Sequence, residues 1–203
     1  MTRRTGRLRR ELTNLPNIVT MSRVALVPGV LFFIDNFSPL RSFIAALFYI
    51  GAAAGDALDG YLARSRGQVS VLGKFLDPLA DKLIVTAVLV FMVALGRVPA
   101  WAVVVFIARD LVINGLRSIA SAEGLVIAAS DGGKIKTALQ LVAIIMLLIH
   151  FSYPLLGLSV NPIDYHRAGL VTLYISMAIS ILSGVAYVRQ FIGVIVRDSR
   201  SAA

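Results

Sequence analysis

The sequence predicts an all-α integral membrane protein with six transmembrane helices. Hydrophobic residues make up 58% of its 203 residues and only 15% are charged, whereas soluble domains are roughly 45–50% apolar and about 25% charged. Long apolar runs recur along the chain, each near the roughly 20 residues that a helix needs to cross a bilayer. A backbone in lipid has to satisfy its own hydrogen bonds, and these runs are too long and continuous for barrel strands, so we expect helices.

Six apolar segments account for the expected helices. The first follows a basic amino-terminal stretch, residues 1–15, and the second ends at a polar loop that begins with Arg64. The third opens at a pair of aspartates, and the basic loop DGGKIKT leads into the fifth. The sixth is the longest and approaches the carboxyl terminus. We place the segments near residues 16–34, 42–64, 77–95, 98–121, 135–157 and 167–195.

Lysine and arginine are distributed unequally between the two sides of such a bundle. Twelve of those in the terminal segments and loops fall on the side that holds both termini, and three (Arg41, Arg97 and Arg167) fall on the other. Because basic loops are retained in the cytoplasm, we expect both termini and the loop between the second and third helices to be cytoplasmic.

The composition also limits domain organisation and partners. With no internal repeat, low-complexity tract or linker, we expect one membrane-embedded domain over residues 1–203, with residues 1–15 as a basic cytoplasmic segment. The net charge of +9 comes mostly from cations between apolar runs, so anionic membrane lipids rather than nucleic acid are the expected partners. The absence of cysteine excludes disulfides, thiol catalysis and cysteine metal sites.

Four aspartates interrupt the apolar pattern in the stretch GDALDGYLARSRGQVSVLGKFLDPLADK, residues 55–82. Asp56 and Asp59 are three residues apart near the end of the second expected helix, and Asp77 and Asp81 are four apart near the start of the third. Each pair would project from one helix face, and adjacent antiparallel helices would turn the two pairs toward each other. At mid-membrane an aspartate costs about 2.5–3.5 kcal/mol, so converging carboxylates require bound cations.

Carboxylates alone indicate the kind of metal and the kind of reaction. Oxygen donors suit Mg²⁺, Mn²⁺ or Ca²⁺ and not zinc. Two such ions at one phosphorus stabilise both the attacking and the leaving oxygen. A carboxylate can also accept the proton of an incoming hydroxyl, and Asp81, the deepest in the third helix, is the candidate base. The alternative, four solvated helix ends, does not explain why four aspartates and no glutamate occur at these spacings.

The pattern D-x₂-D-G-x₂-A-R-x₈-G-x₃-D-x₃-D resembles the signature of the CDP-alcohol phosphatidyltransferases. The resemblance implies a CDP-alcohol phosphotransferase-like fold. It also implies that the protein is a membrane enzyme with six helices, which in this family is usually a homodimer. It also implies that the four aspartates bind two divalent ions, here Mg²⁺ or Mn²⁺, that CMP leaves a CDP-linked donor, and that the last aspartate is the base. All eight fixed positions are present as Asp56, Asp59, Gly60, Ala63, Arg64, Gly73, Asp77 and Asp81.

The same resemblance implies residues that bind the donor, CDP-diacylglycerol. Within and beside the signature these would be Gly60, Arg64, Ser70 and Gly73, and a guanidinium is a natural partner for a diphosphate. The stretch LPNIVTMSR is similar to the first-helix entry of the family, where Asn17 and Thr20 would meet the nucleotide or diphosphate. Capping of the first helix is an almost equally good interpretation of these two polar residues.

Four cations near the fourth and fifth expected helices favour a phosphorylated acceptor. Arg109 and Arg117 lie on nearly one face of the fourth helix, and Lys134 and Lys136 enter the fifth. These cations have too few acids nearby to cancel them, although Arg109 could pair with Asp110 or another helix and the lysines could contact lipid headgroups. The stretches IARDLVINGLR and GKIKT resemble the phosphatidylglycerophosphate synthase branch of the family, whose acceptor is sn-glycerol 3-phosphate.

We therefore expect transfer of the phosphatidyl group from CDP-diacylglycerol to glycerol 3-phosphate, giving phosphatidylglycerophosphate and CMP at the cytoplasmic face of a bacterial-type membrane. Phosphatidylglycerol (the acceptor of a cardiolipin synthase), inositol phosphate and serine remain open as acceptors. A divalent-cation or proton transporter would distribute acids across the membrane, whereas these four gather on one side. A membrane scaffold would leave the aspartates unexplained. His150 and His166 fall on the opposite side from the aspartates and receive no role.

Overall fold

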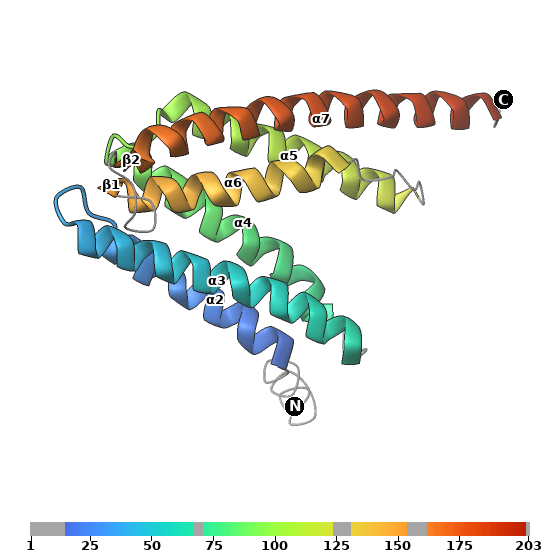
Figure 1. Cartoon of the computed structure of the whole chain (residues 1–203). Helices are drawn as coiled ribbons and strands as arrows, with labels where there is room; N and C mark the ends of the chain where they lie inside the picture. The colour runs from blue at the N-terminus through green and yellow to red at the C-terminus, as the bar shows by residue number, and fades with distance from the viewer. Residues whose placement is uncertain (1–14, 67–70, 124–130, 154–161, 202–203) are drawn as a thin grey trace. The chain divides into compact units, whose positions relative to one another are not determined.

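A computed structural model of the chain describes residues 15–66, 71–123, 131–153 and 162–201, some of them by backbone alone. Each of the six apolar segments contains one helix. The described elements are α2 (Leu15–Phe33), α3 (Pro39–Arg66), α4 (Val71–Ala94), α5 (Ala100–Ala122), α6 (Asp131–Ile149), β1 (Ser152–Tyr153), β2 (Ile163–Asp164) and α7 (Tyr165–Ser201) (Figure 1).

The chain divides into two compact units. The first comprises Met1–Leu95 with Leu148–Phe151, and the second comprises Gly96–Leu147 with Ser152–Ala203. The aspartate motif falls within the first unit, and the four candidate acceptor cations fall within the second. The prediction of one domain over the whole chain stays a prediction.

In the first unit α2 packs against both α3 and α4. The buried side chains of these helices are mostly apolar, and the ring of Phe33 stacks on that of Phe48 with 5.5 Å between centroids. Close van der Waals packing of these side chains holds the helices together inside the unit, because lipid offers no hydrophobic driving force between helices. Its buried residues include Val27, Val30, Ala45, Ala46, Tyr49, Ala52, Val88, Leu89 and Met92.

The turn between α2 and α3 is held by polar groups that would otherwise lie unpaired at two helix ends. Asp35 accepts a hydrogen bond from the backbone N–H of Phe37 and pairs with Arg41 at 2.9 Å. The other Nη of Arg41 donates to the carbonyl of Phe32 at the end of α2, and the hydroxyl of Ser42 donates to the carbonyl of Asp35. The contact with the Phe32 carbonyl satisfies a terminal helix group that has no partner within its own helix, and the other contacts fix the residues between the two helices.

The start of α4 differs from the expected position. The helix begins at Val71, not near residue 77, so Asp77 and Asp81 lie inside a helix and not at its first residues. The expected start followed the apolar run, which Lys74 and Gly73 interrupt. A helix continues past such residues because its backbone hydrogen bonds, not its hydropathy, define it.

The second unit contains α5, α6 and α7 and the small antiparallel β1–β2 ladder. Contacts join α5 to α7, and the Oγ of Ser176 in α7 donates to the carbonyl of Lys136 in α6 at 3.0 Å. The core of this unit includes Ala102, Val103, Phe106, Ile113, Ala143, Ile144, Leu147 and Leu173.

The fifth expected helix was placed too long at its carboxyl end. It was expected to continue to residue 157, but α6 ends at Ile149 and is followed by β1. His150, the residue directly after Ile149, has a φ of 64°, which is the left-handed conformation that commonly ends a helix. Arg97, only 1% exposed, donates from Nη1 to the carbonyl of Leu147 in the last turn of α6. A cation at that end also suits the helix dipole.

Among the described residues, two helices are long and apolar enough to cross a membrane, over Gly132–Ile149 and Tyr165–Ile195. Shorter apolar stretches occur at Val24–Phe33, Pro39–Gly55 and Lys82–Ala94. Many large apolar side chains in these helices are exposed, among them Phe43, Leu47, Val171 and Leu182, as expected for surfaces that meet lipid. Six membrane spans remain a prediction.

Candidate active site

The four motif aspartates lie on two consecutive helices of the first unit. Asp56 and Asp59 belong to α3, and Asp77 and Asp81 belong to α4. The helical backbone confirms the premise of the spacing argument, because residues three or four apart are neighbours on one helix face. The linker between the helices is short, since α3 ends at Arg66 and α4 begins at Val71. The structure describes these four aspartates by backbone only.

The predicted donor-binding residues fall on the same unit. Asn17 and Thr20 lie in the first turns of α2, Gly60 and Arg64 in the last turns of α3, and Gly73 in the first turn of α4. Their side chains are outside the description, and Ser70 lies outside the described residues altogether. Where side chains are described, no group of three or more metal-binding residues gathers. The assignment of the motif aspartates as metal ligands stays a prediction.

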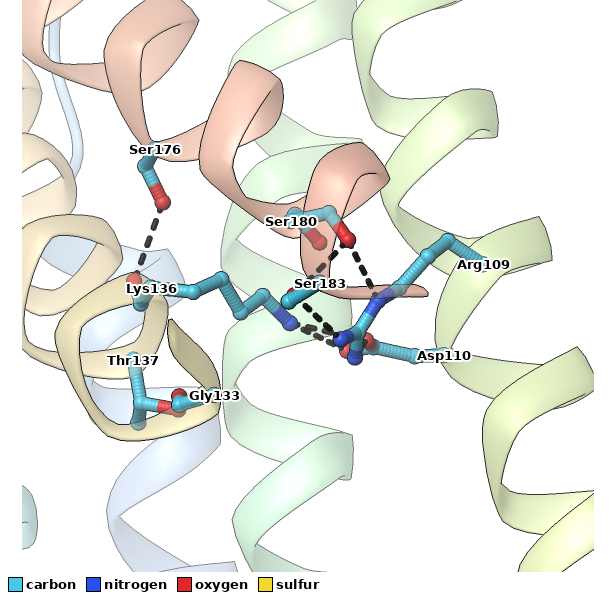
Figure 2. A network of polar contacts seen from close by, with 8 residues as sticks. All are labelled: Arg109, Asp110, Gly133, Lys136, Thr137, Ser176, Ser180 and Ser183. Atoms are coloured by element: carbon cyan, nitrogen blue, oxygen red, sulfur yellow. Dashed lines mark hydrogen bonds and ion pairs between the residues drawn. The ribbon is translucent and has the colours of Figure 1, made fainter. Parts of the chain in front are cut away.

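In the second unit, a partly buried charged cluster links three helices (Figure 2). We call it the Asp110 cluster; it consists of Arg109, Asp110, Lys136, Ser180 and Ser183. The ammonium of Lys136 lies 2.7 Å from Oδ1 and 2.9 Å from Oδ2 of Asp110. Nη1 of Arg109 lies 3.0 Å from the same Oδ1. One carboxylate from α5 is therefore shared by two cations, one of them from α6.

The guanidinium of Arg109 also contacts α7. Its Nε donates to the carbonyl of Ser180 at 3.1 Å, and its Nη2 donates to the hydroxyl of Ser183 at 3.0 Å. The hydroxyl of Ser183 donates in turn to the carbonyl of Ser180. A Cβ on Gly184 would lie 3.4 Å from Nε of Arg109, so the absence of a side chain there leaves room for the guanidinium. Hydrogen bonds from all three nitrogens of the planar guanidinium therefore fix the orientation of the Arg109 side chain.

The contacts decide a question that the sequence left open. Arg109 pairs with Asp110, and Lys136 pairs with the same carboxylate. Their charged nitrogens both lie within 3.0 Å of one oxygen, so they are at most about 6 Å apart. Without the carboxylate, two unit charges at that separation would repel by about 3 kcal/mol at an effective dielectric constant of about 20. Asp110 is the counterion that lets both cations stay in a largely buried place.

Two further cations lie nearer the surface of this unit. Arg117, two turns after Arg109 on α5, is exposed and its guanidinium carbon lies 5.9 Å from the ring centroid of Tyr187 in α7. Lys134 is exposed near the start of α6. The ammonium of Lys136 lies 5.7 Å from the ring centroid of Phe106, a geometry in which the ring face attracts a cation.

Sequence reasoning assigned no functional or polar contact to the last helix, and it missed the contribution of three serines there. Ser176, Ser180 and Ser183 are spaced by four and three residues, the spacing of one helix face, and all three are buried. A serine face in an otherwise apolar helix was the signal available. It could not reveal its partners, because Arg109 and Ser183 are 74 positions apart.

The sequence profile of the CDP-alcohol phosphatidyltransferases matches residues 13–188, which include the aspartate motif and the Asp110 cluster. The chain belongs to the CDP-alcohol phosphatidyltransferase family. Members of this family transfer a phosphatidyl-type group from a CDP-linked donor to an alcohol, and carboxylates on paired helices suit that chemistry.

Several curated relatives of the chain are named for the synthesis of phosphatidylglycerophosphate. A Bacillus subtilis protein named CDP-diacylglycerol–glycerol-3-phosphate 3-phosphatidyltransferase is 37% identical over 186 residues, which cover 86% of this chain and 93% of the relative. A Mycoplasma pneumoniae protein with the same name is 35% identical over 87% of this chain and 86% of its own length. A Mycobacterium tuberculosis protein named probable phosphatidylglycerophosphate synthase is 33% identical, covering 90% and 83%.

Proposed function

We propose that this protein transfers the phosphatidyl group from CDP-diacylglycerol to sn-glycerol 3-phosphate, giving phosphatidylglycerophosphate and CMP. The observation that carries the proposal is the complete aspartate signature on two consecutive helices, α3 and α4. The names of the relatives support glycerol 3-phosphate as the acceptor, and this chain matches most of the length of each relative.

The carboxylates of the signature are suitable ligands for divalent cations. Four carboxylates are the only ligands that the signature supplies, and Mg²⁺ or Mn²⁺ prefers oxygen donors. We assign Asp56, Asp59, Asp77 and Asp81 to two such ions, which when bound would neutralise the diphosphate of the donor. Donor contacts are assigned to Asn17, Thr20, Gly60, Arg64, Ser70 and Gly73.

The reaction needs a base for the acceptor hydroxyl, and we assign this role to Asp81. Its carboxylate accepts the proton as the C1 oxygen of glycerol 3-phosphate attacks the β-phosphorus of CDP-diacylglycerol. A new bond forms between that oxygen and phosphorus, and the bond between the phosphorus and the CMP oxygen breaks. CMP leaves with the electron pair of the broken bond.

The acceptor phosphate is assigned to the cations of the second unit, Arg109, Arg117, Lys134 and Lys136. A phosphate dianion is recognised best by several fixed cationic donors, and Arg109 is held rigidly by three hydrogen bonds. Only three of the five N–H groups of its guanidinium are used in these contacts. The exposed guanidinium of Arg117 supplies a second cation on the same helix.

The membrane arrangement is part of the same proposal. Six helices would span the bilayer as one domain, with both termini and the active site on the cytoplasmic side, where the soluble acceptor is available. The unequal distribution of lysine and arginine supports this orientation. We further propose that the enzyme is a homodimer, as is usual in the family.

The decisive experiment measures CMP release from CDP-diacylglycerol by the purified protein with Mg²⁺ or Mn²⁺. The acceptors compared are glycerol 3-phosphate, phosphatidylglycerol, inositol phosphate and serine, and only glycerol 3-phosphate should release CMP. Release with phosphatidylglycerol alone would replace this acceptor by that of a cardiolipin synthase. Arg117→Gln should raise the KM for glycerol 3-phosphate by roughly 10- to 150-fold, the equivalent of one lost charge-assisted contact, and leave the KM for CDP-diacylglycerol nearly unchanged.

A further inference from the structure

Asp110 has no role in the proposed reaction, yet it is the central residue of the Asp110 cluster. Both of its carboxylate oxygens accept from Lys136, and Oδ1 also accepts from Arg109. The side chain of Lys136 is only 6% exposed and that of Arg109 is 18% exposed. This acid therefore contacts two largely buried cations that come from two different helices.

The two cations differ in how far they depend on Asp110. Arg109 is also held by the carbonyl of Ser180 and the hydroxyl of Ser183, so its guanidinium keeps two anchors on α7 when the carboxylate is removed. Lys136 has a flexible four-carbon stem, and its ammonium is a point charge without a preferred plane. Its shortest described contact is the one to Asp110, at 2.7 Å.

Removing only the negative charge of Asp110 should therefore displace Lys136 more than Arg109. The two cations are close neighbours and would repel each other without the carboxylate. The better anchored guanidinium would stay, and the ammonium would move away from it. The cluster would then present one fixed cation where it now presents two.

We propose that Asp110 is a positioning residue for the acceptor, which holds Lys136 beside Arg109 so that the acceptor phosphate meets two cations at a fixed separation. This inference rests on the proposed function, because it assumes that these cations bind the phosphate of glycerol 3-phosphate. Asp110 itself would not touch the substrate, since a carboxylate repels a phosphate dianion.

The test compares Asp110→Asn, Lys136→Met and the double variant, all as full-length protein, in the CMP-release assay. Each single variant should raise the KM for glycerol 3-phosphate by about tenfold or more and change the KM for CDP-diacylglycerol by less than about twofold, one lost charged contact being the reference. Because Asp110 would act through Lys136, the double variant should be no worse than the more impaired single variant.

Ser176→Ala is the matched control. It removes a hydrogen bond between α7 and Lys136's own helix, α6, because Ser176 donates to the carbonyl of Lys136, but it leaves the charged groups in place. It should keep both KM values. If Asp110→Asn does not yield folded protein, Asp110→Glu retains the charge with one added methylene and should raise the acceptor KM several-fold.

Two results would overturn the inference while the proposed function stands. One is an acceptor KM that is unchanged in Asp110→Asn, or in Asp110→Glu where that variant has to be used. The other is a double variant whose effect equals the product of the single effects, which would mean that Asp110 does not act through Lys136. If the wild-type protein releases no CMP with glycerol 3-phosphate, the proposed function itself fails.

Discussion

A glycine at the α6–α7 contact offers a direct test of how the second unit is packed. Gly169 lies in the second turn of α7, and a Cβ at this position would come within 2.8 Å of Cγ of Leu147, 3.0 Å of its backbone nitrogen and 3.1 Å of Cβ of Met146. The backbone nitrogen cannot rotate away as a flexible side chain can. Gly169→Ala therefore requires the two helices to separate locally.

The expected cost follows from two opposing effects. Overpacking a close contact typically costs about 1–3 kcal/mol, and contact with backbone places this case in the upper part of that range. Alanine gains about 1 kcal/mol over glycine inside a helix. The net destabilisation should be about 1–2 kcal/mol, which corresponds to a decrease of roughly 2–8 °C in the melting temperature for a chain of this size.

Gly193, on the same helix, is the matched control. A Cβ there would meet nothing within 4 Å, so Gly193→Ala should change stability only through the higher helix propensity of alanine. Its melting temperature should equal that of the wild type or rise by a few degrees. The measurement is the thermal unfolding of both purified variants in the same detergent, together with the KM values of the folded fraction, which should not change.

Equal melting temperatures for Gly169→Ala and Gly193→Ala would refute the reasoning. That result would mean that α6 and α7 do not approach as closely as the positions of Leu147 and Met146 require. A stabilised Gly169→Ala variant would be stronger contrary evidence, because helix propensity would then be the only effect at that position.

Three further predictions concern the reaction, the metal and the Asp110 cluster. Asp81→Asn should abolish CMP release and retain CDP-diacylglycerol binding, because a carboxamide cannot accept the acceptor proton; turnover like that of the wild type would exclude the base role. Asp77→Ala should lose the rise in melting temperature that Mg²⁺ or Mn²⁺ gives the wild type, and a retained rise would argue against a shared metal site. Ser183→Ala should destabilise the protein by about 1–3 kcal/mol because Nη2 of Arg109 loses its partner. Ser180→Ala should be neutral or stabilising, since the buried hydroxyl of Ser180 has no hydrogen-bond partner among the described residues; a larger loss for Ser180→Ala than for Ser183→Ala would contradict the contacts.

The sequence was sufficient for the features that depend on neighbours along the chain. Each of the six apolar segments contains a helix, as expected because a long apolar run has few alternatives in lipid. The aspartate pairs could be placed on helices from the apolar runs beside them, and on one face of each helix from their spacing of three and four residues; α3 and α4 agree with the first of these. The family could also be identified from the signature, since its residues lie within 26 consecutive positions.

Only the tertiary structure decided which groups the charged side chains contact. The sequence left Arg109 between a pairing with Asp110, a pairing with another helix and a substrate role, and it gave Lys136 no acid. In the structure Asp110 contacts a lysine 26 positions away, and Arg109 contacts a serine 74 positions away. Spacing rules apply within one helix, whereas these partners depend on how α5, α6 and α7 pack. The end of α6 was decided in the same way, because the left-handed conformation of His150 and the contact of Arg97 with Leu147 are not encoded in the hydropathy of the segment.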